Sequence, residues 1–321
     1  MSYAVLLMIA AVAPFALASA IGSIAVWLSW PRVSHRLARL PPSRRAHALL
    51  VLRVVPLSLG VLSAVIVFPR FAAGEPATSG EHPGVLLITL CVVTIAMLLS
   101  AIVRAVGNTI RARAWLRMVR ARGESTCLGT SRVPALCVDG HVPVMALVGC
   151  IRPQIVASRE LLEHVTADEI DVMLRHELAH RSRHDNVVSA LFHLLPDPLG
   201  YTKRGHEIAD SWRRATEEAA DDLAAASEPA RLLLAAGLVR LARLAHGPLP
   251  DIAASPLLSQ SFLERRIRRL LGPSPSATHA GGPSAAVLLL FGLTLFGALI
   301  AQDPLRNAIN VIIETAINGL P

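Results

Sequence analysis

Residues 166–180 read TADEIDVMLRHELAH, and this stretch decides most of what the sequence predicts about the fold around it. Thr166, followed three residues later by Glu169, is typical of a helix N-terminus with an N-cap hydroxyl and a capping-box acid. Apolar side chains then recur at the spacing of one helical face: Ile170, Met173, Leu174 and Leu178. The sequence therefore predicts a helix that begins just after Thr166 and carries HELAH in its second half.

The HELAH segment is a candidate metal site. His176 and His180 lie four residues apart, so both imidazoles project from one helical face, one turn apart. That spacing suits two ligands of one Zn²⁺ ion, each at about 2.0–2.1 Å from the metal. Glu177 is rotated by one residue and is placed to act on a water rather than to bind the metal. The pattern also arises by chance, so the prediction depends on a third ligand.

Two sources of a third ligand fit the sequence poorly. The metzincin pattern requires a Gly and a His at fixed offsets after the second His, but Arg183 and Asn186 occupy those offsets, which excludes that class. His184 lies one turn after His180. Three histidines along one straight helix do not easily surround one ion, so His184 is a poor ligand.

The segment RATEEAADD, residues 214–222, offers a better candidate. Glu217 and Asp221 lie one turn apart on one helical face, where Glu217 can bind the metal and Asp221 can accept from the free N–H of a ligating His. The small side chains of Ala219 and Ala220 allow this helix to approach the first one closely. Without HExxH the segment would be read as a solvated acidic face. Glu218 is an alternative ligand in a poorer register.

The composition is that of a membrane protein. Of the 321 residues, 53% are hydrophobic and 17% are charged, and the mean hydropathy is +0.51, whereas soluble domains carry about 25% charged residues. Four apolar runs are long enough for a bilayer, which takes about 20 residues: residues 4–28, 49–68, 85–106 and 285–301. The first has no basic n-region and is too long for a signal peptide, so it is read as a retained span.

Arginines are distributed unevenly between the loops, which predicts the orientation of the spans. They are frequent after the first and third runs and rare in the loop 69–84. By the positive-inside rule, the N-terminus is then outside and residues 104–282 are cytoplasmic. The expected domains are three spans in 1–106, a cytoplasmic domain in 107–282, a fourth span in 283–301 and a short extracellular tail in 302–321. The net charge of +8 is assigned to these loops, and no direct nucleic-acid contact is expected.

The segment between the third and fourth runs predicts an α+β domain, so the whole chain is expected to be a mainly α membrane protein. Residues 134–157 are rich in β-branched side chains with turn breaks, and helices are expected at 207–226 and 229–245. Residues 187–195 form a short apolar piece, buried or interfacial. The basic amphipathic segment 261–271 lies either on the inner leaflet or against the domain. Cys137 and Cys150 can face each other across a hairpin, but free thiols are expected in the cytosol.

The order of these segments resembles the membrane metallopeptidases of the BlaR/MecR antirepressor family. The matching stretches are RPQIVASRELLE (152–163), HELAHRSRHDN (176–186), EEAADDLA (217–224) and SFLERRIRRLL (261–271), and the likeness covers about residues 1–300. It implies a gluzincin-type domain of two ligand helices beside a small sheet. It also implies roles for individual residues. These are zinc ligands His176, His180 and Glu217, Glu177 as the catalytic acid/base, and Asp221 and Asp185 as partners of the ligands. The family commonly has Cys at the position of Ala220, which is not a ligand.

The resemblance also implies a substrate, a cytosolic transcriptional repressor of the BlaI/MecI type. The family's β-lactam sensors carry an extracellular penicillin-binding domain after the last span. Here residues 302–321 follow it and contain no S-x-x-K, so direct β-lactam sensing is not expected. The trigger is then expected to act through the spans, the outer loop, the tail or a partner sensor.

Three other functions compete with this one. A quality-control or processing peptidase like HtpX or the CAAX-type enzymes shares HExxH…ExxxD. An intramembrane peptidase would need the charges around HELAH inside hydrocarbon, which is costly. A scaffold with structural zinc would need four protein ligands. The second stabiliser of the oxyanion stays unassigned, with Tyr201 a weak candidate.

Overall fold

The computed structural model describes residues 3–74, 84–139, 144–150, 152–244 and 260–272. Three long helices open the chain: α1 (Tyr3–Leu37), α2 (Pro42–Gly74) and α3 (Val85–Arg122). Each contains a segment long and apolar enough to cross a membrane: Ala11–Leu37, Pro42–Phe68 and Val85–Arg122. The chain is therefore a multi-pass membrane protein. The fourth predicted span, at 285–301, lies outside the described residues.

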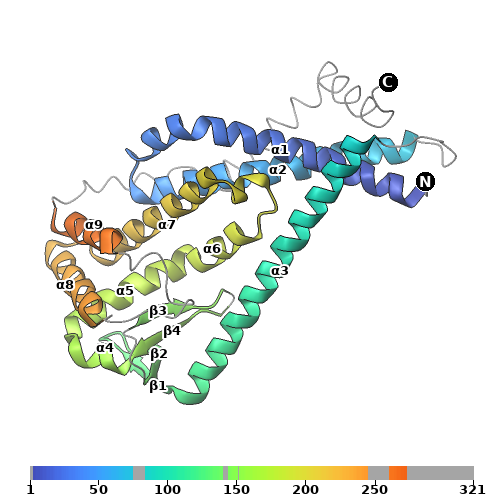
Figure 1. The fold of residues 1–321 in the computed structure, drawn as a ribbon. Helices are drawn as coiled ribbons and strands as arrows, with labels where there is room; N and C mark the ends of the chain where they lie inside the picture. Colours follow the sequence, from blue (N-terminus) through green and yellow to red (C-terminus); the bar gives the residue numbers. More distant parts are fainter. Residues whose placement is uncertain (1–2, 75–83, 140–143, 151, 245–259, 273–321) are drawn as a thin grey trace.

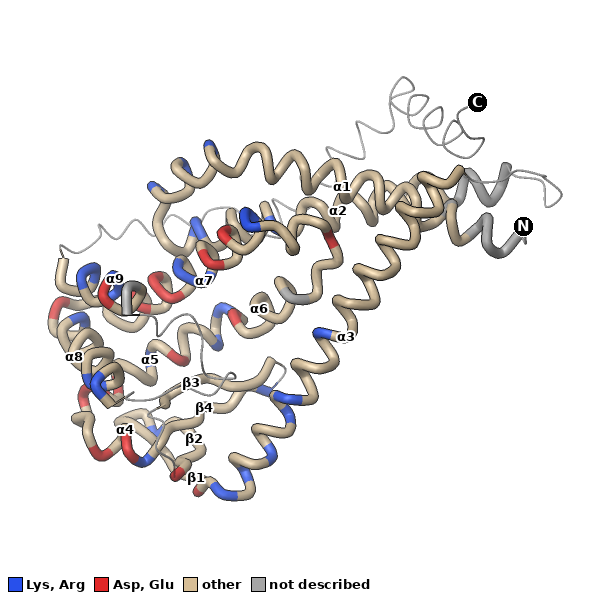
Figure 2. The backbone as a smooth tube through the Cα atoms, in the orientation of Figure 1, with Lys and Arg blue, Asp and Glu red and all other residues tan. Residues whose placement is uncertain are grey.

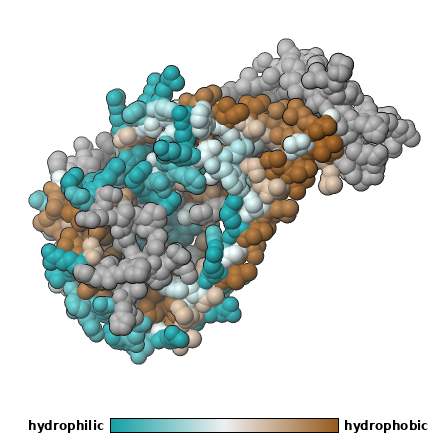
Figure 3. Space-filling view, in the orientation of Figure 1, coloured by the Kyte–Doolittle hydropathy of each residue, from teal (hydrophilic) through white to brown (hydrophobic). Residues whose placement is uncertain are grey.

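Helices α1 and α2 pack side by side as a hairpin, and α3 runs from the far end of that hairpin to the sheet (Figure 1). Close packing in the hairpin depends on glycine, because a Cβ on Gly60 would lie 2.8 Å from the Phe15 ring. Apolar residues gather on the surface of these helices, whereas the rest of the visible face is largely polar (Figure 3). A helix continues past its apolar run wherever polar residues keep helical propensity. Helix α3 therefore extends sixteen residues beyond the predicted end at 106.

A four-stranded sheet follows α3, with β1 (Glu124–Leu128), β2 (Val133–Val138), β3 (Met145–Val148) and β4 (Gln154–Ser158) in the order β1-β2-β4-β3. Strands β2 and β4 are parallel, and the outer pairs are antiparallel. The sequence indicated the last three strands but not β1, whose polar, mostly exposed residues do not alternate with apolar ones. Strand β3 is an edge strand, and it lies beside the helix that carries HELAH.

The remaining helices are α4 (Arg159–His164), α5 (Ala167–Arg183), α6 (Asp185–Leu194), the 3-10 helix η1 (Pro198–Tyr201), α7 (Lys203–Ala224), α8 (Glu228–Leu244) and α9 (Gln260–Leu271). Helix α5 begins at the predicted capping box, in which Thr166 Oγ1 accepts from the Glu169 N–H and Glu169 accepts from the Thr166 N–H. The main core joins α5 to the sheet on one side and to α8 and α9 on the other. Helix α9 thus packs on the domain.

Helix α7 lies between α5 and the membrane hairpin (Figure 1). A second apolar cluster joins it to α1 and α2 through Trp30, Leu49, Ile208 and Trp212, among others. Polar contacts add to this interface, since Trp30 Nε1 donates to Glu207 at 2.9 Å and Arg45 of α2 pairs with Glu218. The hairpin is therefore packed directly against the helix that carries Glu217.

Candidate metal centre

Helix α5 places the two histidines as its periodicity predicts. His176 and His180 lie one turn apart and are buried, with their Nε2 atoms 3.1 Å from each other. Their rings meet nearly at right angles, at 87°. Both Nε2 atoms therefore point toward the same small volume, on the side of α5 that faces α7.

Helix α7 brings Glu217 to the same volume. Its Oε2 lies 3.4 Å from His176 Nε2 and its Oε1 lies 3.4 Å from His180 Nε2. Helices α5 and α7 are in contact, and the small side chains of Ala219 and Ala220 on α7 are fully or almost fully buried. His176, His180 and Glu217 form a buried group whose ligand atoms lie within 4.8 Å of one another and could hold a metal ion.

Each histidine has a carboxylate on the side away from this centre. His176 Nδ1 lies 3.0 Å from Asp221 Oδ1, and His180 Nδ1 lies 2.8 Å from Asp185 Oδ2. Asp185 reaches His180 because α5 ends at His184, whose left-handed backbone (φ 57°) turns the chain into α6. A carboxylate at Nδ1 favours a proton there and leaves the Nε2 lone pair free for a metal.

The arrangement of these atoms fits a zinc ion. With both Nδ1 atoms protonated, two Nε2 lone pairs and a carboxylate would face one another at 3.1–3.4 Å. Acceptors this close repel one another unless cations lie near them. Arg266 is one such cation, 2.9 Å from Glu217 Oε2 and 3.4 Å from His176 Nε2, and a metal ion between the three ligand atoms would be a second. Two imidazoles and one carboxylate are also a ligand set used by catalytic zinc sites, which keep the fourth position open.

Glu177 lies next to this group but is turned away from it. Its Oε2 accepts a hydrogen bond of 2.7 Å from the backbone N–H of Leu147 on the edge strand β3. Burial raises the pKa of Glu177, while the charges of His176 and His180 and the Leu147 N–H lower it, and the net shift is upward. The carboxyl group is thus held at the sheet side of the centre, in a setting that raises its affinity for a proton.

Residues 2–197 match the family model described as BlaR1 peptidase M56, which covers more than half of the chain. The chain belongs to the M56 family of metallopeptidases. The matched region contains α1, α2, α3 and the whole HELAH segment, but it ends before Glu217. Glu217 therefore enters the group on the geometry of α7. A search of curated proteins found no match.

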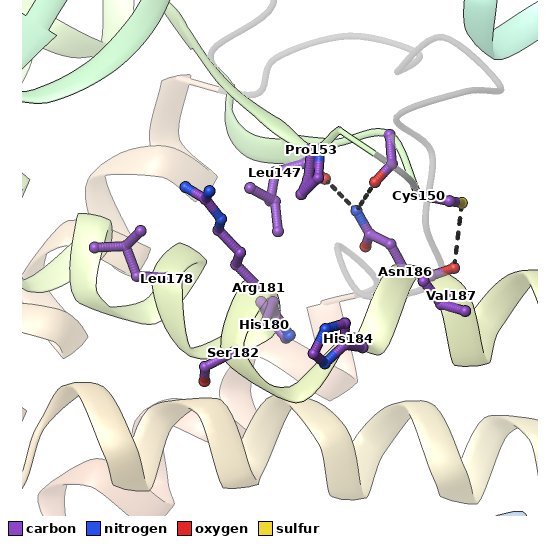
Figure 4. A pocket seen from close by; sticks show the side chains of 11 residues that line it. Leu147, Cys150, Pro153, Leu178, His180, Arg181, Ser182, His184, Asn186 and Val187 are labelled. Atoms are coloured by element: carbon purple, nitrogen blue, oxygen red, sulfur yellow. Dashed lines mark hydrogen bonds between the residues drawn. The ribbon is translucent and has the colours of Figure 1, made fainter.

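This M56 peptidase has a cavity of about 520 Å³ beside His180, between the edge strand and the junction of α5 and α6 (Figure 4). Asn186 Nδ2 donates to the carbonyl oxygens of Leu147 and Gly149, both at 2.9 Å, and so ties α6 to the open edge of β3. From the sequence, Asn186 was named only as one of the two residues that exclude the metzincin pattern, so this contact was not predicted.

Other residues considered from the sequence lie outside the metal-binding group. His184 is exposed on the cavity wall, and Glu218 is turned toward Arg45 and Arg265. The Tyr201 hydroxyl contacts Ser100 Oγ at 2.6 Å and Arg104 at 2.9 Å, both on α3. The four cysteines are free, as expected: Cys91, Cys127, Cys137 and Cys150.

One residue of the M56 centre escaped the sequence analysis. Arg266 of α9 is buried, and its guanidinium contacts Glu217 and Asp221 at distances of 2.6–2.9 Å. The charge pattern of residues 261–271 was read as a solvated or lipid-facing surface. The preference of an isolated amphipathic helix does not reveal that one of its arginines enters a site 45 residues away in sequence.

Proposed function

We propose that this M56 peptidase is a zinc-dependent endopeptidase with His176, His180 and Glu217 as metal ligands and Glu177 as the acid/base. The observation that supports this most is the convergence of two histidines and one glutamate at 3.1–3.4 Å, beside a second glutamate, Glu177, that binds none of them. A scaffold with structural zinc would use four protein ligands, and the group found among the described residues has three.

Each residue of the site has a separate role in peptide hydrolysis. A zinc ion bound here would supply a Lewis acid that activates water and polarises the scissile carbonyl. Glu177 takes a proton from the attacking water at its carboxylate and passes it to the leaving amine, as a general acid/base. Asp221 and Asp185 hold the protons on His176 Nδ1 and His180 Nδ1, which keeps both Nε2 atoms available as ligands.

The catalytic domain, residues 107–282, is proposed to face the cytoplasm. The arginines after the first and third spans support this orientation. The proposed substrate is a cytosolic transcriptional repressor of the BlaI/MecI type, supported by membership of the family described as BlaR1 peptidase M56. Because α1 and α2 pack directly on α7, a change in span packing, or a partner sensor acting on the spans, would reach the ligand helix and control the site.

The first prediction tests the substrate. Repressor integrity is followed by immunoblot in cells with the wild type, with Glu177→Gln and with no protein, under several envelope stresses. Gln is isosteric and still accepts from the Leu147 N–H, so the variant should fold and keep zinc. Loss of the acid/base should slow cleavage by about 10²–10⁴-fold.

The competing quality-control function gives a different result in the same strains. If misfolded membrane proteins accumulate with Glu177→Gln while every repressor stays intact in all three strains, the HtpX-like function is correct. Zinc content of the purified variant is the control, because a variant without zinc would show that Glu177 is needed to build the site.

A further inference from the structure

Helix α9 packs against α7, and basic residues occur on α9 and acidic residues along α7 (Figure 2). Arg265 lies 3.0 Å from Glu218 Oε1, and Arg269 donates to both oxygens of Asp222 at 2.6 and 2.7 Å. Arg268 is exposed and pairs with Glu264 on its own helix. With Arg266, three of the arginines in this helix contact acidic residues of α7.

Arg266 differs from its neighbours in burial. Its side chain is 6% exposed, compared with 54% for Arg265 and 23% for Arg269. Exposed ion pairs contribute little to the stability of the fold, because water screens the charges and the long side chains lose conformational entropy. A fully buried guanidinium is costly unless its donors are satisfied, and such groups persist where the geometry is specific.

The donors of Arg266 are directed at the metal-binding group. Nε donates to Asp221 Oδ2 at 2.9 Å and Nη2 to Asp221 Oδ1 at 2.6 Å, so the carboxylate is held from both oxygens. Nη1 lies 2.9 Å from Glu217 Oε2. One planar side chain thus contacts both the ligand carboxylate and the carboxylate that orients His176.

Glu217 and Asp221 need such a partner. They lie one turn apart on the same buried helical face, where two like charges repel. Burial alone would raise the pKa of Glu217, but Arg266 and the adjacent histidines lower it to about 2. Asp221 is affected in the same way, and its pKa is also lowered. The Arg266 guanidinium, in contact with both carboxylates, thus offsets the repulsion between them.

We propose that Arg266 is a positioning residue of the metal centre, which acts through Glu217 and Asp221 to hold the ligand set in place, so that α9 is part of the site. This inference rests on the proposed zinc centre. It assigns to one arginine of a basic helix a role that the other arginines of that helix do not share.

The second prediction tests this role by zinc affinity, measured by competition with a chelator on the detergent-purified full chain. Arg266→Gln should bind zinc about 10–100-fold more weakly, the usual effect of removing a partner of a metal ligand. Arg269→Gln is the matched control, because it removes an α9–α7 pair that touches no ligand, and its affinity should stay within about threefold of the wild type. Arg266→Lys keeps the positive charge but loses the planar guanidinium, so its zinc affinity should lie between those of Arg266→Gln and Arg269→Gln.

A second readout separates positioning from loss of folding. The absorption spectrum of the Co²⁺-substituted protein should change in Arg266→Gln and stay unchanged in Arg269→Gln. If Arg266→Gln does not fold, the comparison is made with Arg266→Lys.

The possible contrary results are distinct. An equal loss of zinc affinity in the Arg266 and Arg269 variants would show that α9 only stabilises the fold and does not position the ligands. Unchanged zinc binding in Arg266→Gln would show that the guanidinium does not position the ligands, and tighter binding would show that it competes with the metal. Either result would make the inference wrong. A wild-type chain that binds no zinc would overturn the proposed function itself.

Discussion

Single residues in the centre have distinct positions relative to the expected ion. Glu217 faces both Nε2 atoms, Asp185 lies behind His180, and His184 lies on the cavity wall, although all three are acids or histidines near HELAH. Removing a ligand leaves an open coordination position, whereas removing the partner of a ligand only weakens its orientation. A substitution should therefore weaken zinc binding most at a ligand, less at a residue that orients a ligand, and not at a residue that does neither.

The third prediction is a graded series measured as zinc per chain and zinc affinity. Glu217→Ala should lose most of the bound zinc, because one of three protein ligands is gone. Asp185→Asn should bind zinc about 10–100-fold more weakly, since the partner of His180 Nδ1 loses its charge. His184→Ala should keep its zinc. The reverse order of Glu217→Ala and His184→Ala would contradict the ligand assignment.

At the scale of elements, the position of α7 depends on a close contact at its N-terminus. A Cβ on Gly205 would lie 1.9 Å from the carbonyl oxygen of Leu199 in η1. The backbones of α7 and η1 therefore meet directly, and the contact sets where α7 begins. Gly107 in α3 offers a contrast, because a Cβ there would find no atom within 4 Å.

The fourth prediction compares these two glycines through the thermal unfolding midpoint in detergent. Gly205→Ala should destabilise the fold by about 1–3 kcal/mol, the usual cost of overpacking. Gly107→Ala should be neutral or stabilising by up to about 1 kcal/mol, because Ala is the better helix former and meets no neighbour. A lower midpoint for Gly107→Ala than for Gly205→Ala would show that the α7–η1 contact is not as close as described.

At the scale of the whole molecule, the membrane hairpin and the catalytic helices form one packed unit. Arg45 of α2 pairs with Glu218, the residue next to the ligand Glu217, and Arg53 of α2 pairs with Asp197 between α6 and η1. Both members of the Arg53–Asp197 pair are buried. Breaking such a pair by removing one partner is strongly unfavourable, so the spans and the domain are held together at the site itself.

The fifth prediction tests the proposed orientation with cysteine labelling. Cys127 and Cys150 are exposed on the catalytic domain, so a membrane-impermeant maleimide should label them only after permeabilisation. With both replaced by Ser, a Ser79→Cys variant should label in intact cells, because the loop 69–84 is expected outside. Labelling of Cys127 in intact cells would reverse the topology.

The sequence by itself determined the features that depend on the spacing of residues within one element. The capping box, the α5 helix, the three spans and the shared face of His176 and His180 were predicted and are confirmed, because i,i+4 spacing fixes which side chains share a face. Glu217 was predicted to join the two histidines from its residue type and from the family resemblance, and it lies with them in one group. Only the tertiary structure decided the contacts of Arg266, of Asn186 and of strand β1. Each depends on two elements distant in the chain coming together, and neither partner carries a local pattern that points to the other. The physical reason is burial. An exposed arginine contacts mainly water, whereas the buried Arg266 has fixed partners, and which arginine is buried depends on how the helices pack.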